Sequence, residues 1–171
     1  HKFFESKEFV RLEKRFSVLR QIDVSKCFYS IYTHTVGWAI KGKEFTKANL
    51  GAHTFEARFD TLMQQANYNE TNGIVVGPEI SRIFAEIILQ DADRQIQSVL
   101  AGQPRLFEGV DYAIRRYVDD YSIFANSSDT LDVVERVVRD VLEQYKLYVN
   151  ENKIKNFERP FVSNLSLARS E

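Results

Sequence analysis

Three aspartates are the residues most able to do chemistry in this chain, one standing alone and two adjacent. Asp23 ends the β-prone run SVLRQIDV, and Asp119 and Asp120 separate two further β-prone runs. Adjacent acids at a hairpin are locally unfavourable, because aspartate is a poor strand former and like charges repel. Carboxylate oxygens are the ligands that Mg²⁺ prefers, so binding of hard cations would explain the pair.

Each acidic segment also has an ordinary explanation when it is taken alone. An aspartate pair between strands is commonly a solvated turn, and an aspartate at a strand end is commonly a cap or a surface residue. Together, the two segments can bring carboxylates from adjacent strands to one point. Two Mg²⁺ ions held there could activate an attacking hydroxyl and stabilise a leaving pyrophosphate, which is the chemistry of phosphoryl transfer.

A sheet must position these acids, and the remaining pattern predicts a sheet packed against helices. We expect strands over residues 17–24, 112–118, 121–125, 146–149 and, approximately, 154–162. Apolar periodicity predicts helices over 2–16, 54–65, 79–100 and 131–145. Residues 28–41 are helical or mixed, and 42–52, with Gly42, Asn49 and Gly51, are expected to be a loop. This order predicts an α+β fold, a two-layer arrangement of an antiparallel sheet with helices packed on one face.

Composition and charge restrict the function only weakly. The 171 residues fit one domain with a substantial core. A formal net charge of −1 and a pI near 6.4 argue mildly against nucleic-acid binding, although the carboxylates of a metal site would themselves lower the charge. The single cysteine, Cys27, excludes an internal disulfide framework and favours a reducing, cytoplasmic location. No stretch approaches the roughly 20 apolar residues that span a bilayer, so we expect no membrane contact.

Four segments, in this order, resemble the palm motifs of reverse transcriptases. They are DVSKCFYSIY at 23–32, GPEISRIFAE at 77–86, YVDD at 117–120 and LYVNENK at 147–153. The resemblance implies a polymerase palm with a ferredoxin- or RRM-like core, acting as an RNA-directed DNA polymerase that uses deoxynucleoside triphosphates (dNTPs). Because the chain opens at His1 rather than Met, we expect residues 1–171 to be a palm domain cut from a longer protein, with fingers and thumb largely absent.

The resemblance also implies roles for the acidic residues and for one lysine. Asp23 and Asp119 would be the principal ligands of two Mg²⁺ ions, or of Mn²⁺ as a substitute, assisted by the backbone carbonyl of Val24. Asp120 would add negative charge and a weaker contact. Lys153 would approach the triphosphate and donate a proton to pyrophosphate, although a lone lysine after a strand is usually solvated.

Further residues of the first two motifs would bind the nucleotide under this resemblance. Phe28 stands five residues after Asp23, at the steric-gate position. Its ring would exclude a 2′-hydroxyl and so favour deoxynucleotides, but outside the family it is equally well a core aromatic. Gly77 and Pro78 would let the backbone approach the incoming base and the template, although the same pair is an ordinary helix start.

Two residues on the first turn of the predicted helix 79–100 complete the implied substrate contacts. Ser81 and Arg82 would contact the nucleotide or the template. Arg82 has an alternative that needs no ligand, because it could pair with Glu79 or Glu86 as an ordinary surface charge of a helix.

The second motif departs from the common family pattern in a way that indicates a subgroup. Val76 stands where many reverse transcriptases carry glutamine before the glycine. The variant motif and the run Ser30–His34 resemble bacterial abortive-infection and defence-associated reverse transcriptases. Some of that group polymerise without a conventional template, so template-independent DNA synthesis is an alternative. The implied partners are dNTPs, an RNA template or nucleic-acid primer and the nascent DNA, with a homo-oligomer or a non-coding RNA as further partners.

Two readings from other functional classes compete with a polymerase. A nucleotide cyclase also uses a hairpin on a related palm, but it usually carries a glycine-rich acidic tip rather than YVDD. A catalytically inert nucleic-acid-binding or scaffold palm would not need the set Asp23, Asp119 and Asp120.

The remaining residues with chemical potential are histidines and aromatics. No Cys/His cluster accompanies His34 or His53, so a packed or solvated histidine is preferred for each. Trp38 and the tyrosine-rich segments could stack on bases, but core packing is the preferred explanation.

Overall fold

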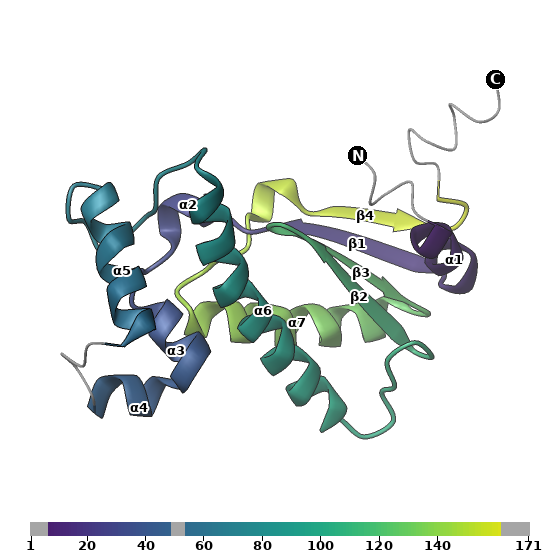
Figure 1. Ribbon diagram of the computed structural model, residues 1–171. Coiled ribbons are helices and arrows are strands. Elements are labelled where there is room, and N and C mark those ends of the chain that lie inside the picture. The colour runs from purple at the N-terminus through teal and green to yellow at the C-terminus, as the bar shows by residue number, and fades with distance from the viewer. Residues whose placement is uncertain (1–6, 49–53, 162–171) are drawn as a thin grey trace. The chain divides into compact units, whose positions relative to one another are not determined.

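The computed structural model describes residues 7–48 and 54–161 of the chain, as helices and one four-stranded sheet (Figure 1). The chain divides into two compact units. We call residues 1–24, 99–138 and 149–171 the sheet unit, and residues 25–98 and 139–148 the helical unit. Each unit is described by itself.

The sheet unit contains a fully antiparallel sheet with the strand order β2-β3-β1-β4. Its strands are β1 (Val18–Asp23), β2 (Tyr112–Tyr117), β3 (Asp120–Ala125) and β4 (Lys155–Glu158). Strands β2 and β3 form a hairpin, and β1 enters between β3 and β4 (Figure 1). Strand β1, which ends at Asp23, is therefore hydrogen-bonded on both sides, which fixes its register.

Side chains alternate between the two faces of this sheet, and each face has its own cover. On one face, Leu19 lies opposite Phe124, and both belong to a buried cluster with Phe9 of α1 (Lys7–Arg15). The rings of Phe9 and Phe124 meet edge to face, with centroids 5.2 Å apart, an arrangement worth about 0.5–1.5 kcal/mol beyond the burial of the rings.

The opposite face of the sheet carries Arg20, whose guanidinium reaches the first half of α7 (Ser128–Gln144). Arg20 donates to Asp132 at 2.8 Å and to Glu135, and Glu135 is only 7% exposed. Next to it on the same face lie the fully buried side chains of Ile22, Tyr121 and Ile123. Apolar packing and a partly buried ion pair together hold α7 against β1.

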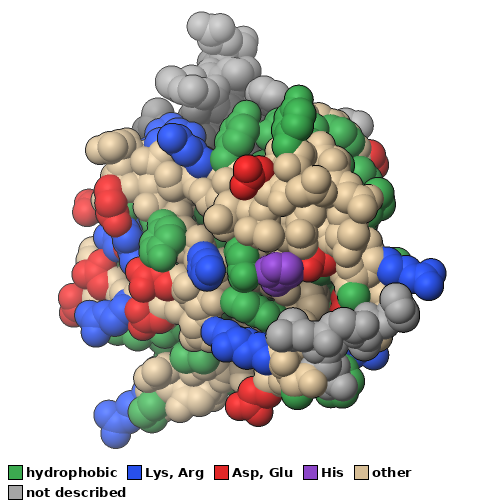
Figure 2. Space-filling model, turned by 90° about the vertical axis from the view of Figure 1, so that its left-hand side faces the viewer, with side chains coloured by type: hydrophobic (Ala, Val, Ile, Leu, Met, Phe, Trp, Pro, Cys, Tyr) green, Lys and Arg blue, Asp and Glu red, His purple; other side chains and the backbone are tan. Residues whose placement is uncertain are grey.

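The helical unit consists of several short helices and most of one long helix. These are α2 (Cys27–Ser30), α3 (Thr35–Lys41), α4 (Lys43–Ala48), α5 (Phe55–Ala66) and most of α6 (Glu79–Ala101). The hydroxyl of Thr54 caps α5 by accepting from the backbone N–H of Ala57. The rings of Phe59 and Phe84 meet edge to face at 4.9 Å and join α5 to α6. Figure 2 shows one face of the surface, where apolar, basic and acidic side chains are interspersed.

The expected α+β class, with its antiparallel sheet and packed helices, is confirmed, but two segments differ from expectation. Residues 42–52 were expected to be a loop, yet Lys43–Ala48 form α4, because a run of good helix formers follows the turn at Gly42; residues 49–53 lie outside the described residues. The strand expected over 146–149 is reduced to a bridge between Val149 and Val24, since Lys146 has a left-handed backbone with φ 61°.

The other predicted elements are found with shifted ends. Helix α7 begins at Ser128, three residues before the predicted start, because the Ser127 hydroxyl accepts from the N–H of Thr130. The first strand, the helix near 54–65 and the helix 79–100 are confirmed within two residues. None of the helices in the described part of the chain combines the length and the apolar character needed to cross a bilayer.

Candidate active site

The acidic hairpin tip is built from a two-residue turn, Val118 and Asp119. The sequence predicted Asp119 and Asp120 as the turn, but Asp120 is instead the first residue of β3 and pairs with Tyr117. Val118 has φ 57°, a left-handed conformation that costs a branched residue roughly 1–3 kcal/mol. Arg116 holds this turn by donating from Nη1 to the carbonyl of Val118 at 2.7 Å.

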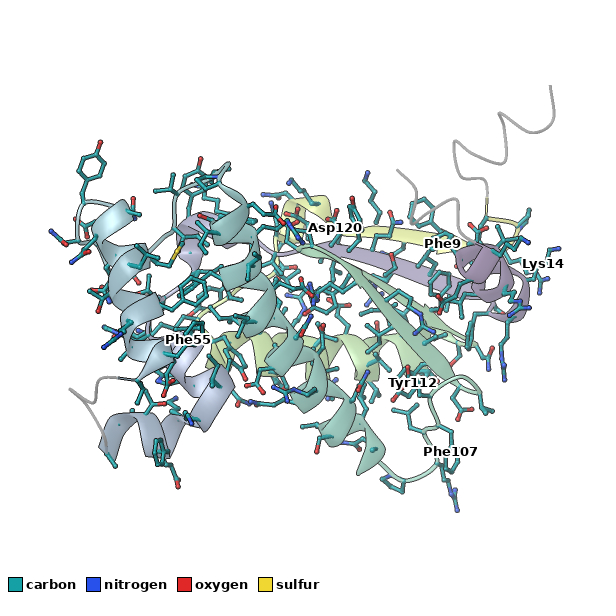
Figure 3. All side chains as sticks on the ribbon, viewed as in Figure 1. Phe9, Lys14, Phe55, Phe107, Tyr112 and Asp120 are labelled. Atoms are coloured by element: carbon teal, nitrogen blue, oxygen red, sulfur yellow. The ribbon has the colours of Figure 1, made fainter. Side chains whose placement is uncertain are left out.

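Pairing of β1 with β3 brings the third aspartate to this tip. Asp23 lies directly opposite Asp120, and the backbone N–H of Val24 donates to the carbonyl of Asp119 at 3.2 Å. Side chains of directly opposite residues share a face of the sheet, with Cβ atoms about 4.5–5.5 Å apart. The carboxylates therefore gather at one end of the sheet; Figure 3 labels Asp120 there, whereas Phe9 and Lys14 lie at the other end.

Asp23 has two carboxylate oxygens in different surroundings. Its Oδ2 lies 3.2 Å from Nζ of Lys153, which ends the short 3₁₀ helix Glu151–Lys153. Its Oδ1 is buried and has no hydrogen-bond partner among the described residues. The side chain as a whole is only 17% exposed. A buried polar atom without a partner is costly, and more so when it is charged, so this oxygen is suited to a bound cation.

The two aspartates of the hairpin are held in an environment that disfavours their charge. Burial raises the pKa of Asp119, and the neighbouring charge of Asp23 raises it further, against hydrogen bonding to its own backbone and the charges of Lys153 and Arg116. Burial also raises the pKa of Asp120, followed by the charges of Asp119 and Asp23. Negative charge therefore exceeds its local compensation, which is the condition in which a divalent cation binds well.

The carboxylates are neighbours without being a finished metal cage. Across the described residues, no three His, Cys, Asp or Glu side chains converge closely enough to form a ready-made ligand cluster. Mg²⁺ commonly takes one or two protein carboxylates and fills the remaining positions with water and substrate phosphates. The donor set of Asp23, Asp119 and Asp120, which includes the buried Oδ1 of Asp23, fits that mode of binding.

The substrate residues predicted from the first two motifs lie in the helical unit, whereas Asp23, Asp119, Asp120 and Lys153 lie in the sheet unit. Phe28 lies on α2, is half-buried, and accepts from the N–H of Ile74 through its carbonyl. Gly77 is exposed and has φ 117°, a conformation that side-chain-bearing residues rarely adopt. A Cβ at Gly77 would meet no atom within 4 Å, so the backbone there is open to an approaching ligand.

The predicted substrate residues at the start of α6 differ in their burial and in their hydrogen-bond partners. Pro78 precedes the helix, and its carbonyl accepts from the N–H of Ser81. Ser81 is 1% exposed, with no hydrogen-bond partner for its hydroxyl among the described residues, and this burial argues against its direct contact with a nucleotide. Arg82 pairs with Glu79 at 2.9 Å, which is the ion pair that the surface-charge alternative described.

Sequence reasoning missed two residues that shape the acidic end of the sheet. Arg116 clamps the turn, and Asn150 both donates its N–H to the carbonyl of Asp23 and accepts from the N–H of Asn152. The only available signal was position, since Arg116 precedes the aspartate pair and Asn150 precedes Lys153 within the fourth motif. Neither position specifies a backbone contact before the strands are paired.

Comparison with known proteins gives one family and one structural group. A family model described as "Reverse transcriptase (RNA-dependent DNA polymerase)" matches residues 2–165. No curated protein matches the chain.

Solved telomerase structures are similar to this chain in fold. Telomerase from Candida albicans, in complex with a fragment of telomeric RNA, has a TM-score of 0.63 at 12% identity and covers 95% of this chain and 31% of its own. Apo telomerase from Candida tropicalis has a TM-score of 0.61 at 12% identity and covers 89% of this chain and 31% of its own. The chain thus spans about a third of the length of these proteins, and identities this low show the fold alone.

Proposed function

The chain belongs to the reverse transcriptase family, and from that premise we propose that it is the palm of an enzyme that makes DNA from dNTPs on an RNA template. One observation carries the proposal: the register of β1 and β3 sets Asp23 opposite Asp120 while Val24 hydrogen-bonds to Asp119. Segments far apart in sequence thereby deliver their carboxylates to one end of a rigid sheet, which is where phosphoryl transfer needs them.

Divalent ions are the proposed cofactor, with Asp23 and Asp119 as principal ligands, the Val24 carbonyl assisting and Asp120 adding charge. When bound, two Mg²⁺ ions, or Mn²⁺ in their place, would activate a 3′-hydroxyl and neutralise the leaving pyrophosphate. The buried Oδ1 of Asp23 and the raised pKa values of the hairpin aspartates support this assignment. Lys153, already at 3.2 Å from Asp23, supplies a mobile cation and proton donor for the triphosphate.

Residues of the helical unit are proposed to select and hold the nucleotide. Phe28 would exclude the 2′-hydroxyl of ribonucleotides, and the open backbone at Gly77 and Pro78 would approach the base and the template. Arg82 would reach the nucleotide by exchanging its partner Glu79, as ion pairs exposed to solvent do at little cost. Ser81, being buried, would act by shaping the helix start rather than by touching the ligand.

The proposed setting is the bacterial cytoplasm, in defence against phages. The second-motif variant at 77–86 and the run Ser30–His34 support that subgroup. The proposed partners are an RNA template or nucleic-acid primer, the nascent DNA, and either a second copy of the chain or a non-coding RNA. Within this subgroup, template-independent synthesis is the second candidate activity.

The test measures incorporation of dNTPs by the full-length protein that carries this chain. Asp119→Ala is expected to lower Mg²⁺-dependent incorporation by roughly a hundredfold or more, because a developing charge loses its stabilisation. Asp140→Ala, an exposed carboxylate of α7, is the matched control and is expected to retain activity. Undiminished synthesis in Asp119→Ala would refute the proposal.

Additional arms of the same assay separate the alternatives. Incorporation that persists without an RNA template would select template-independent synthesis. A cyclic product from a single nucleotide would indicate a cyclase. A calorimetric titration with no Mg²⁺-dependent nucleotide binding would indicate an inert scaffold palm.

A further inference from the structure

The helical unit contains a large pocket formed by residues of α3, α4 and α5. Its volume is about 1090 Å³, slightly above the roughly 300–1,000 Å³ that small-molecule sites occupy. None of its lining residues belongs to the catalytic or substrate-binding set proposed above. The pocket is therefore distinct from that set and has room for a ligand larger than a bare aromatic ring.

One side of the pocket is aromatic, with Tyr32, Trp38 and Phe45 among its lining residues. The rings of Tyr32 and Trp38 lie 5.9 Å apart between centroids. Phe45 is 51% exposed, and α4, which carries it, buries none of its residues. The sequence favoured core packing for Trp38; its side chain is half-buried and also lines this pocket, where its ring can serve as an aromatic platform for a flat ligand.

A polar group stands among these aromatics. His34 Nδ1 hydrogen-bonds to Oδ2 of Asp60, and Gln64 Nε2 donates to the other oxygen of Asp60 at 2.7 Å. The ring of His34 also meets Tyr32 edge to face, with centroids 4.9 Å apart. With Nδ1 pinned by a carboxylate, the remaining hydrogen-bonding atom of the imidazole is Nε2, which accepts when neutral and donates when protonated. The edges of nucleobases present both kinds of partner.

Basic side chains also line the pocket. Lys47 and Arg58 line the pocket with exposed side chains, and Lys43 Nζ lies 4.6 Å from the centroid of the Trp38 ring. Figure 2 shows a histidine side chain (purple) with an acidic side chain beside it and basic side chains nearby. Lysine and arginine at the mouth of an aromatic pocket are suited to phosphate groups.

We propose that this pocket binds a nucleotide as a second site, with its base stacked on the ring of Trp38. His34, oriented by Asp60, hydrogen-bonds the edge of the base, and Lys47 and Arg58 hold the phosphate. The volume accommodates the sugar as well as the base. The base is carried either by a free mononucleotide or by an unpaired nucleotide of a strand, since the chemistry of recognition is the same for both.

Trp38 is the only tryptophan in the chain, so its fluorescence reports directly on this pocket. Titration of the 171-residue protein with AMP, without Mg²⁺, is expected to give saturable quenching as the base stacks. His34→Ala is expected to weaken binding about tenfold, as the loss of one hydrogen bond to the ligand does. The matched control is Tyr68→Ala, an aromatic that is 92% exposed, does not line the pocket and is expected to change nothing.

Additional ligands identify what is recognised and where it comes from. Lys47→Ala, on an exposed position that the fold tolerates, is expected to weaken AMP severalfold and leave adenosine unaffected. Ribose 5-phosphate, which has no base, is expected to cause no quenching. Quenching by a single-stranded oligonucleotide but not by its abasic analogue, with AMP silent, would assign the site to a strand and equally support recognition of a base.

Two results would overturn the proposal: no saturable quenching by mononucleotide or oligonucleotide, or equal quenching in His34→Ala and in wild type with circular dichroism showing both folded. Asp119→Ala is expected to leave the quenching in place while it abolishes polymerisation. The failure of this site and the failure of the proposed polymerase function are therefore distinguishable.

Discussion

Replacing Asp120 with asparagine is expected to stabilise the protein when no divalent ion is present. Asp120 lies directly opposite Asp23, and burial together with the charges of Asp119 and Asp23 raises its pKa. Like charges opposed across neighbouring strands destabilise by an amount comparable to roughly 0.2–1 kcal/mol per pair. Because asparagine keeps the shape and removes the charge, we expect a gain of about 0.5–1 kcal/mol at neutral pH, or roughly 1–4 °C in Tm for a chain of this length.

Addition of Mg²⁺ is expected to reverse the order of the two proteins. A ligand that binds only the folded state stabilises it by RT ln(1 + [L]/Kd), which is about 1.4 kcal/mol at ten times the Kd. Wild type should gain this amount, since Asp23, Asp119 and Asp120 together attract the ion. Asp120→Asn should gain less, because one of the three negative charges is gone.

Thermal unfolding followed by circular dichroism, in EDTA and in increasing Mg²⁺, measures both effects. Asp140→Asn is the matched control, since it removes the same charge from an exposed position on α7 and should behave as wild type does. The reasoning is refuted if Asp120→Asn is no more stable than wild type in EDTA and gains as much from Mg²⁺. The opposed carboxylates would then form no cation site.

Three further perturbations follow from the same contacts. Mg²⁺ affinity measured by calorimetry should fall as the pH is lowered, because protons compete with the ion for Asp119 and Asp120. The fall should begin above the ordinary carboxyl pKa of 3.8, since the pKa values of both groups are raised. In metal-free protein the folded state then holds more protons than the unfolded state, so the free energy of unfolding decreases as pH rises through these pKa values. Arg20→Ala should cost about 1.5–3 kcal/mol in urea unfolding, since Asp132 and the buried Glu135 both lose the guanidinium from which they accept, and a loss below about 0.5 kcal/mol would show that other contacts compensate for this ion pair. Val118→Gly should raise stability by about 1 kcal/mol, because relief of left-handed strain exceeds the entropy that glycine loses on folding; a destabilised variant would mean that the turn is not strained.

Local sequence signals predicted the elements well where periodicity and chemistry agreed. The β-prone run ending at Asp23 and the apolar face of the helix after Pro78 both reappear as β1 and α6. The predictions were wrong for two segments whose backbone conformation was not decided by the local sequence pattern. Residues 43–48 were expected to be loop because glycine and asparagine flank them, and residues 146–149 lost their strand to a left-handed residue at Lys146.

For the site residues too, the sequence indicated some features and not others. The types and order of the acidic and basic residues indicated a metal-dependent phosphoryl transfer, and the spacing of Arg82 and Glu79 on a helix allowed for their ion pair, but nothing in the sequence indicated that Ser81 would be buried. Likewise, His34 read alone was most simply a packed or solvated histidine. Its bond to Asp60 on α5 is what makes it an oriented group in a pocket.

The sequence by itself determined which groups are available: three aspartates, the lysine after the last motif, the alternation that makes one face of each strand apolar, and the family to which the chain belongs. Only the tertiary structure decided that Asp23 stands opposite Asp120, that one oxygen of Asp23 is buried with no hydrogen-bond partner in the part of the chain that the structure describes, and that Trp38 borders a cavity. The physical reason is that strand register and burial arise from contacts between segments far apart along the chain. Such contacts set desolvation and charge proximity, and these two quantities turn an acidic residue into a metal ligand.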